Sequence, residues 1–121
     1  MWKSSCVCAL LVAAGTSSAP QDYSMMGMGT ATCSELTAVG RGPAEQSGAI
    51  YFVLAWAQGF ISGINFQRMH VGDSYKNMAG IAVEDQIDRL QTFCKDRPTA
   101  RIADAVLDLY GALPKANPSR P

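Results

Sequence analysis

Apolar residues are densest in the middle of the chain, where they predict one long helix. No proline interrupts residues 44–68, and apolar side chains dominate residues 49–64. Because they cover most of the helix circumference, we expect this central helix to be buried on several sides. The apolar run is shorter than the about 18 residues of a membrane span and contains Gln58 and Ser62, so no membrane span is expected.

Three shorter helices are predicted around it. Thr32 and Glu35 have the spacing of a capping box, which predicts a helix from about residue 32 to Val39 and then a turn over residues 40–43. Apolar residues at helical spacing mark two more helices, one with Val83, Ile87, Leu90 and Cys94, the other with Ile102, Val106, Leu109 and Leu113. The predicted fold class is all-α, a small four-helix cluster around a central apolar helix.

The ends of the chain have a different composition. Residues 1–19 show the order of a secretory signal, with Lys3, an apolar stretch and then small residues, so we expect an exported, periplasmic protein. Residues 20–31 lack periodicity and are expected to form a flexible arm. The helical domain is predicted over residues 32–113, and residues 114–121 are predicted to be a disordered tail.

The cysteines support an oxidising location. Cys6 and Cys8 lie in the signal segment, which leaves Cys33 and Cys94 in the exported chain. A lone pair in an oxidising compartment is expected to be bridged, and we predict one disulfide between these two residues. A loop of about sixty residues gives a stabilisation of about 4 kcal/mol.

Charge and candidate chemistry exclude several functions. The chain has 10 basic and 10 acidic residues without a run of one sign, so nucleic acid is not an expected partner. His70 is the only histidine and falls in a flexible connection predicted over residues 69–80. We therefore expect no enzyme active site, cofactor or zinc site. One soft copper site stays open as an alternative, with the thioether and imidazole ligands Met25, Met26, Met28, Met69, His70 and Met78.

A stripe of small residues on the central helix points to assembly. Ala55, Gly59 and Gly63 lie four residues apart, a spacing that lets another helix approach closely. The central helix also has more apolar surface than three short helices can cover. We therefore predict a homodimer at neutral pH.

Two short motifs flanking the central helix resemble a known family. The segments Thr32–Leu36 and Leu90–Pro98, with Trp56 between them, are similar to the HdeA/HdeB-type periplasmic acid-stress chaperones. The resemblance implies an ATP-independent holdase that is inert at neutral pH and exposes apolar surface to unfolded client proteins in acid. The candidate client-binding residues, for which ordinary core is the alternative role, are Ile50, Tyr51, Val53, Leu54, Trp56, Phe60 and Ile61.

Two other functions remain open. The stretch from Trp56 to Gly63 resembles a helix of the small periplasmic immunity proteins that inhibit a rival's secreted cell-wall amidase. Those proteins commonly carry further cysteines in that helix, which this stretch lacks. A structural subunit of the cell envelope is the third reading.

Overall fold

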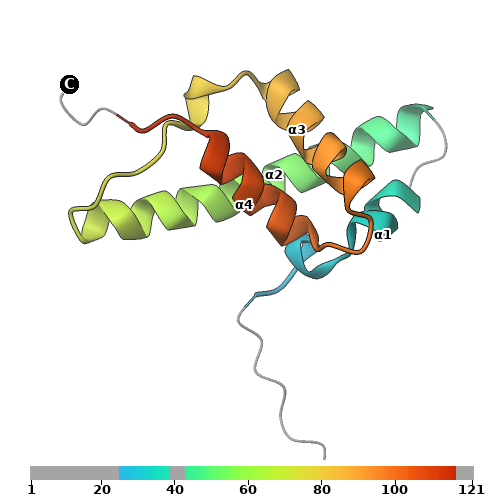
Figure 1. Cartoon of the computed structure of the whole chain (residues 1–121), viewed down its shortest axis with the longest axis horizontal. Coiled ribbons are helices and arrows are strands. Elements are labelled where there is room, and N and C mark those ends of the chain that lie inside the picture. Colours follow the sequence, from blue (N-terminus) through green and yellow to red (C-terminus); the bar gives the residue numbers. More distant parts are fainter. Residues whose placement is uncertain (1–24, 39–42, 117–121) are drawn as a thin grey trace, which may run out of the picture.

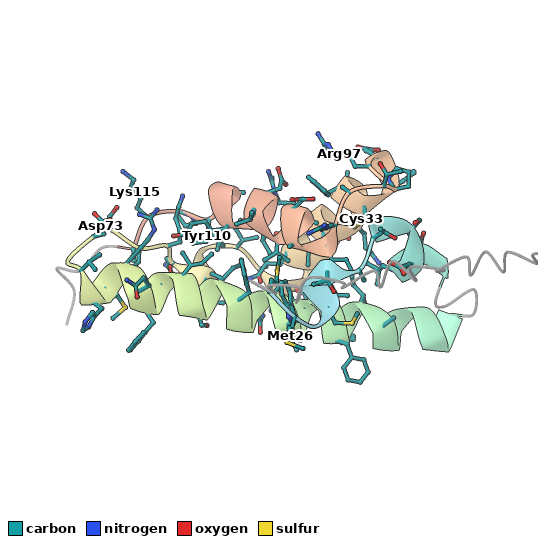
Figure 2. The ribbon with its side chains drawn as sticks, turned by 90° about the horizontal axis from the view of Figure 1, so that it is seen from below. Met26, Cys33, Asp73, Arg97, Tyr110 and Lys115 are labelled. Carbon is teal, nitrogen blue, oxygen red and sulfur yellow. A yellow bond between two sulfur atoms is a disulfide. The ribbon has the colours of Figure 1, made fainter. Side chains whose placement is uncertain are left out.

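The helices pack as two layers. The computed structural model describes residues 25–38 and 43–116. In it, α2 (Pro43–His70) forms one layer, and all three shorter helices lie on one side of it (Figures 1 and 2). These are α1 (Cys33–Ala38), α3 (Val83–Asp96) and α4 (Ile102–Ala112), and two single 3-10 turns accompany them, η1 (Met28–Thr30) and η2 (Met78–Gly80). The predicted all-α four-helix fold is confirmed.

The long helix α2 is buried along one side only. Its buried residues recur at helical spacing and are Ile50, Val53, Leu54, Ala57, Ile61 and Asn65. The prediction of a central helix buried on several sides is therefore wrong. A helix of 28 residues extends for about 42 Å, and three short helices that all pack on the same side leave its other side open.

The helix at the centre of the core is α4. Five of its 11 residues are buried, and it packs against α3, α2 and η1. All four positions predicted to face the core, Ile102, Val106, Leu109 and Leu113, are buried as expected. Two buried alanines, Ala103 and Ala105, keep its surface narrow enough for neighbours to pack on several sides.

The buried side of α3 differs from the prediction at its first turn. Leu90 and Cys94 are buried as expected, whereas Val83 is exposed. Gln86 is buried instead, and its Nε2 donates hydrogen bonds to the carbonyl oxygens of Met78 (3.1 Å) and Ile81 (2.8 Å). A buried amide that is hydrogen-bonded in this way carries little desolvation cost, so the side chain can anchor η2 to α3.

The domain begins earlier than residue 32. Gly29, in the segment expected to be a flexible arm, is buried against the ring of Trp56. The carbonyl oxygen of Ala31 accepts a hydrogen bond from the backbone N–H of Ile102 at 2.9 Å. Residues 28–31 are therefore part of the packed domain. Residues 1–24, including the predicted signal segment and the start of the arm, and most of the predicted turn over 40–43 lie outside the described residues.

The domain also extends past residue 113. The backbone N–H of Asn77 donates to the carbonyl oxygen of Pro114, and that of Ala116 donates to Tyr75, both at 2.8 Å. The first residues of the predicted disordered tail thus pair with the connection between α2 and α3. Residues 117–121 lie outside the described part of the chain.

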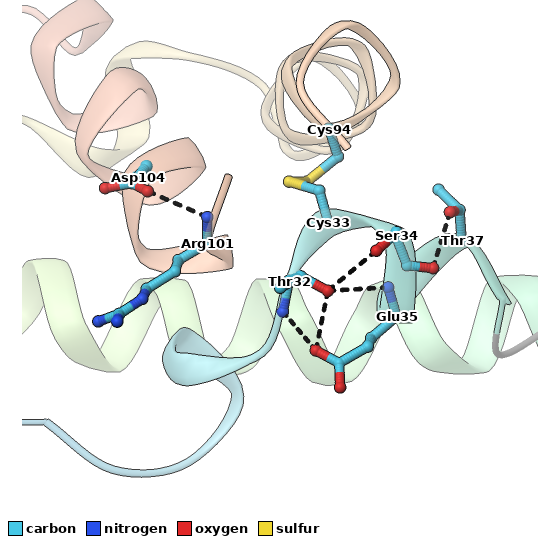
Figure 3. Close-up of a disulfide and its surroundings, with 8 residues drawn as sticks. All are labelled: Thr32, Cys33, Ser34, Glu35, Thr37, Cys94, Arg101 and Asp104. Carbon is cyan, nitrogen blue, oxygen red and sulfur yellow. Dashed lines mark hydrogen bonds between the residues drawn. A yellow bond between two sulfur atoms is a disulfide. The ribbon is translucent and has the colours of Figure 1, made fainter. Parts of the chain in front are cut away.

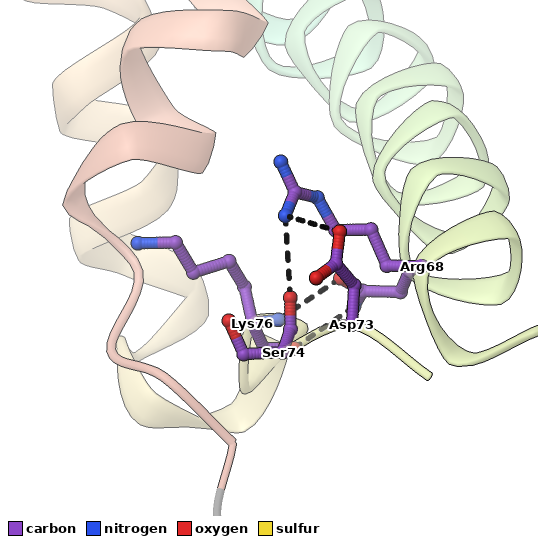
Figure 4. Close-up of polar contacts among 5 residues, drawn as sticks. Arg68, Asp73, Ser74 and Lys76 are labelled. Atoms are coloured by element: carbon purple, nitrogen blue, oxygen red, sulfur yellow. Dashed lines mark hydrogen bonds and ion pairs between the residues drawn. The ribbon is translucent and has the colours of Figure 1, made fainter. Parts of the chain in front are cut away.

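The connection after α2 is anchored by side chains of α2 itself. The Asn65 side chain donates to the carbonyl oxygen of Lys76 (2.8 Å) and accepts from its N–H (3.0 Å). At the helix end, Arg68 Nη1 donates to the carbonyl oxygen of Ser74 (3.4 Å) and lies 3.8 Å from Asp73 Oδ2 (Figure 4). These contacts fix a segment that the sequence predicted to be flexible.

Replacing Gly29 by valine is expected to destabilise the domain by about 1–3 kcal/mol. A side chain at this position would overlap the Trp56 ring, because the backbone of η1 lies directly on the indole. Urea unfolding followed by tryptophan fluorescence measures the change. Gly111→Ala is the matched control, since a Cβ there meets no neighbour and alanine raises helix propensity. Equal stability of the Gly29 variant and the wild type would contradict the packing of η1 on Trp56.

Candidate functional site

One disulfide joins the start of α1 to the last turn of α3. The Cα atoms of Cys33 and Cys94 are 4.8 Å apart, and 61 positions separate the two residues in sequence (Figure 3). Both side chains are buried in the core. The predicted disulfide is confirmed, and it connects the two helices that flank the core.

Hydrogen bonds hold α1 beside this disulfide. The backbone N–H groups of Cys33 and Ser34 donate to the carbonyl oxygens of Ala100 and Pro98, each at 2.8 Å. The loop between α3 and α4 therefore satisfies the free N–H groups at the start of α1. A helix of six residues is not stable alone in water, so α1 depends on these contacts and on the disulfide.

The predicted capping box is present at the start of α1. The backbone N–H of Thr32 donates to Glu35 Oε2 at 2.6 Å, and the N–H of Glu35 donates to Thr32 Oγ1 at 3.3 Å (Figure 3). The Thr32 hydroxyl donates to the same carboxylate oxygen at 2.9 Å. The backbone and then the hydroxyl hydrogen bonds from Thr32 hold the pKa of Glu35 below its usual value of 4.5. Its contribution to stability is therefore present at neutral pH and lost as the pH falls through the lowered pKa.

Glu35→Gln is expected to flatten the acid limb of the stability curve. Glutamine keeps a hydrogen-bond acceptor for Thr32 but cannot be protonated near pH 4, so the variant loses only the pH-dependent part of this contact. Urea unfolding at neutral pH and below pH 4 measures the difference. We expect a small change at neutral pH and a smaller loss of stability on acidification than in the wild type. An identical pH profile in both proteins would contradict this role of Glu35.

Two more carboxylates make ordered contacts on the α4 side of the domain. Asp108 Oδ2 accepts a hydrogen bond from Arg89 Nε at 2.8 Å, which joins α4 to α3. Asp104 Oδ2 accepts from the backbone N–H of Arg101 at 3.0 Å and caps the start of α4. Surface contacts of this kind contribute about 0–1 kcal/mol each.

The residues predicted to bind clients divide into two groups. Ile50, Val53, Leu54 and Ile61 lie in the core, so they can contact another protein only after the domain opens. Trp56 and Phe60 are half-buried, and their rings stack with centroids 5.0 Å apart. Tyr51 is 58% exposed in the folded chain. The structure therefore brings together a covered set and an accessible set on the same helix.

The side of α2 that faces away from the other helices is apolar and exposed. We call it the open face of α2, and its residues are Gly48, Phe52, Ala55, Gly59, Gly63 and Phe66. Phe52 is 73% exposed and Phe66 is 72% exposed. A Cβ added at Gly59 or Gly63 would meet no neighbour, so no described part of the chain packs on the small-residue stripe. Figure 2 shows α1, α3 and α4 together on one side of α2, so no other described α-helix lies on its opposite side.

Two shallow grooves border the open face. One, of about 390 Å³, lies between α2 and the start of the described chain and is lined by Met25, Met26 and Trp56, among others. The second, of about 620 Å³, extends from Gly59 and Phe60 towards Val71. Both grooves include Gly59 and Phe60, so they follow one side of α2. Side chains of another protein have room to enter on either side of these residues.

The sequence did not separate Phe52 and Phe66 from the core residues. Apolar side chains occur all around α2, so hydrophobicity alone does not show which side of this helix faces the core. One signal was present in the small residues. Ala55, Gly59 and Gly63 share one side of α2, and all three are exposed.

The methionines and His70 are not gathered at one place. Met25 and Met26 lie near Trp56, whereas Met69 and His70 are exposed at the end of α2, about 20 Å further along the helix. The His70 ring stacks on Phe66 with centroids 6.5 Å apart. Among the described residues no group of three histidine, cysteine or acidic side chains is placed to hold a metal ion. Met69 and His70 therefore share no site with Met25 and Met26.

The segment Gly48–His70 is long and apolar enough to cross a membrane by length and composition, and about a third of it is buried inside the domain. The core helix of a soluble protein passes the same test.

No family model, curated protein or solved structure matches the chain. Its function is therefore inferred from the chemistry of its own residues.

Proposed function

We propose that the protein is an exported, ATP-independent holdase that binds unfolded proteins during acid stress. The observation that carries the proposal is the apolar surface on both sides of α2. One side forms the core, and the other side presents Phe52, Phe66 and the half-exposed Tyr51 and Met69 to solvent. Opening of the domain would add the core side to the open face and create a large apolar surface for denatured clients.

The charges of the chain support acid as the trigger. Without the predicted signal segment, which contains Lys3, the chain has nine basic and ten acidic residues. Near pH 2 the carboxylates are neutral and the basic side chains remain charged, so the protein becomes strongly positive. The same protonation weakens the contacts that Glu35 makes with Thr32 at the start of α1, because these contacts lower the pKa of Glu35.

The disulfide supports a limited opening rather than complete unfolding. Because Cys33 and Cys94 stay linked, the chain between them, which contains α2, remains a closed loop when the packing is lost. An opened loop presents its apolar helix but cannot expand like a free chain. This is the state in which a holdase can bind clients and still refold after neutralisation.

Light scattering of a client enzyme that precipitates after acid treatment tests the proposal. We expect the protein to suppress scattering at about pH 2–3 and to have no effect at pH 7. Lysozyme, which is similar in size and disulfide-bonded, serves as an inert control. Absence of protection at low pH would reject the holdase function.

A second function is favoured by the fact that the open face is already exposed in the folded chain. A face of this kind suits a protein that binds one folded partner at neutral pH, such as an inhibitor of a cell-wall amidase or a subunit of an envelope complex. The pH dependence separates the two functions. Tight binding of one partner at pH 7, without client protection in acid, would favour the inhibitor or the subunit.

A further inference from the structure

The open face of α2 is symmetric in sequence about Gly59. Ala55 lies four positions before Gly59 and Gly63 lies four positions after it, and both are small. Phe52 lies seven positions before Gly59 and Phe66 lies seven positions after it. With 3.6 residues per turn, offsets of four and seven stay on one stripe of a helix. All five residues are exposed. Reversing the direction of the helix therefore leaves the pattern of large and small side chains nearly unchanged.

We propose that this face binds the same face of a second copy of the chain, with the two α2 helices antiparallel and Gly59 on the two-fold axis. In this arrangement Phe52 of each copy faces Phe66 of the other. Ala55 of each copy faces Gly63 of the other, and the two Gly59 residues meet at the centre. The interface is isologous, because both copies contribute the same surface.

The small residues allow the two helices to approach closely. A Cβ at Gly59 or Gly63 would meet nothing within the chain, so packing inside the domain does not require glycine at either position. Glycine also lowers helix propensity more than any residue except proline. Contact between two helix backbones explains both glycines, since it brings the axes to the short end of the 8–10 Å range for packed helices.

The two phenylalanine pairs close the ends of the contact. Each pair lies about 10 Å from the centre along the helix, and the rings can stack against each other where the helices diverge. Antiparallel helices also place each positive N-terminal end beside a negative C-terminal end, whereas parallel helices would place like ends together. The dipoles therefore favour the antiparallel pairing over the parallel one.

The exposed apolar area is close to that of a small specific dimer interface. An aromatic side chain has about 150–250 Å² of surface, and Phe52, Phe66 and Tyr51 expose between 58% and 73% of theirs. With Met69, Met26 and the backbone around Gly59, each copy can cover several hundred Å². This approaches the roughly 800 Å² per partner of a stable interface. The pairing concerns the folded protein at neutral pH and does not rest on the proposed holdase function, so a negative client assay leaves it intact.

Sedimentation equilibrium of the exported protein at pH 7 tests the association. We expect the mass of two chains for the wild type, and a dissociation constant at least about 100-fold higher for Phe66→Asp. Leu107→Asp on α4 is the control, because Leu107 is another exposed apolar residue but lies outside α2, so its loss should leave the dimer intact. A wild-type monomer at high concentration, or an unchanged dimer in Phe66→Asp, would overturn the proposal.

Gly59→Leu separates loss of the interface from loss of the fold. Leucine has room in the single chain and a higher helix propensity than glycine, so the helical circular dichroism of the variant should be preserved. The added side chain should nevertheless block the contact at the two-fold axis and yield monomers. A dimer of normal affinity in Gly59→Leu would show that the axis does not pass through this position.

Cysteine cross-linking tests the direction of the helices. In the antiparallel pair, Ala55 of one copy lies next to Gly63 of the other, whereas the two Ala55 residues are about 12 Å apart along the axis and beyond disulfide reach. A mixture of Ala55→Cys and Gly63→Cys proteins should therefore form mixed cross-linked dimers on mild oxidation, and Ala55→Cys alone should not. Efficient cross-linking of Ala55→Cys with itself would indicate a parallel pair and refute the antiparallel arrangement.

Discussion

Replacing Cys33 and Cys94 together by serine is expected to lower the free energy of unfolding by about 4 kcal/mol. The disulfide closes a loop across 61 positions of the chain, and both cysteines are buried in the core. The six-residue helix α1 has no independent stability and is attached to α3 by this bond. Since small domains are stable by only about 5–15 kcal/mol, this loss is a large share of the total stability at neutral pH.

Urea unfolding by circular dichroism measures this effect, and reduction of the wild type supplies its control. Treatment with a reductant should lower the stability of the wild type to that of the double-serine variant and should leave the variant itself unchanged. The intact mass of the protein should rise by two hydrogen atoms on reduction. Two free thiols in the unreduced, folded protein, or a loss of less than about 1 kcal/mol in the variant, would contradict the stabilising role of the bond.

Acidification from pH 4 to pH 2 is expected to open the domain while the disulfide stays intact. Carboxylates lose their charge in and just above this range, so the chain becomes strongly positive. The pKa of Glu35 is lowered in the folded state, so its stabilising contribution is lost as the pH falls through that lowered value.

Binding of an apolar dye and loss of near-UV circular dichroism measure the opening. Added salt should shift the transition to lower pH, because it screens repulsion among the basic side chains. The reduced protein should expand further at pH 2 than the disulfide-bonded protein. A compact, dye-free protein at pH 2 would contradict the acid transition, and a transition that ignores salt would show that charge repulsion does not drive it.

The sequence was sufficient for the elements and the disulfide because these depend on local or compositional signals. The Thr32–Glu35 spacing identified the start of α1, and Pro98 and Pro114 bounded the last two helices. The cysteine pair followed from subtraction of the signal segment. The residues that set the helix ends are close together in the sequence, and the two cysteines of the disulfide are the ones left outside the predicted signal segment.

The orientation of α2 depends on tertiary packing and was not predictable in the same way. Because apolar residues lie all around this helix, any of several sides could face the core. Only the placement of the short helices decides that Phe52 is exposed while Val53 is buried. The packing of Gly29 on Trp56 likewise joins two distant segments, one of which had no periodicity. Gln86 was missed because a buried glutamine is identified by the carbonyl groups it meets, not by its neighbours in sequence.

The most direct test of the proposed function is one pH titration that follows opening and client protection in the same sample. Dye binding reports the exposure of apolar surface, and light scattering reports aggregation of an acid-denatured client. If the opened domain is the holdase, both signals should change together between about pH 4 and pH 2, and both should reverse on neutralisation. Protection that is absent after the domain has opened, or that is already complete at pH 7, would contradict the acid-activated holdase.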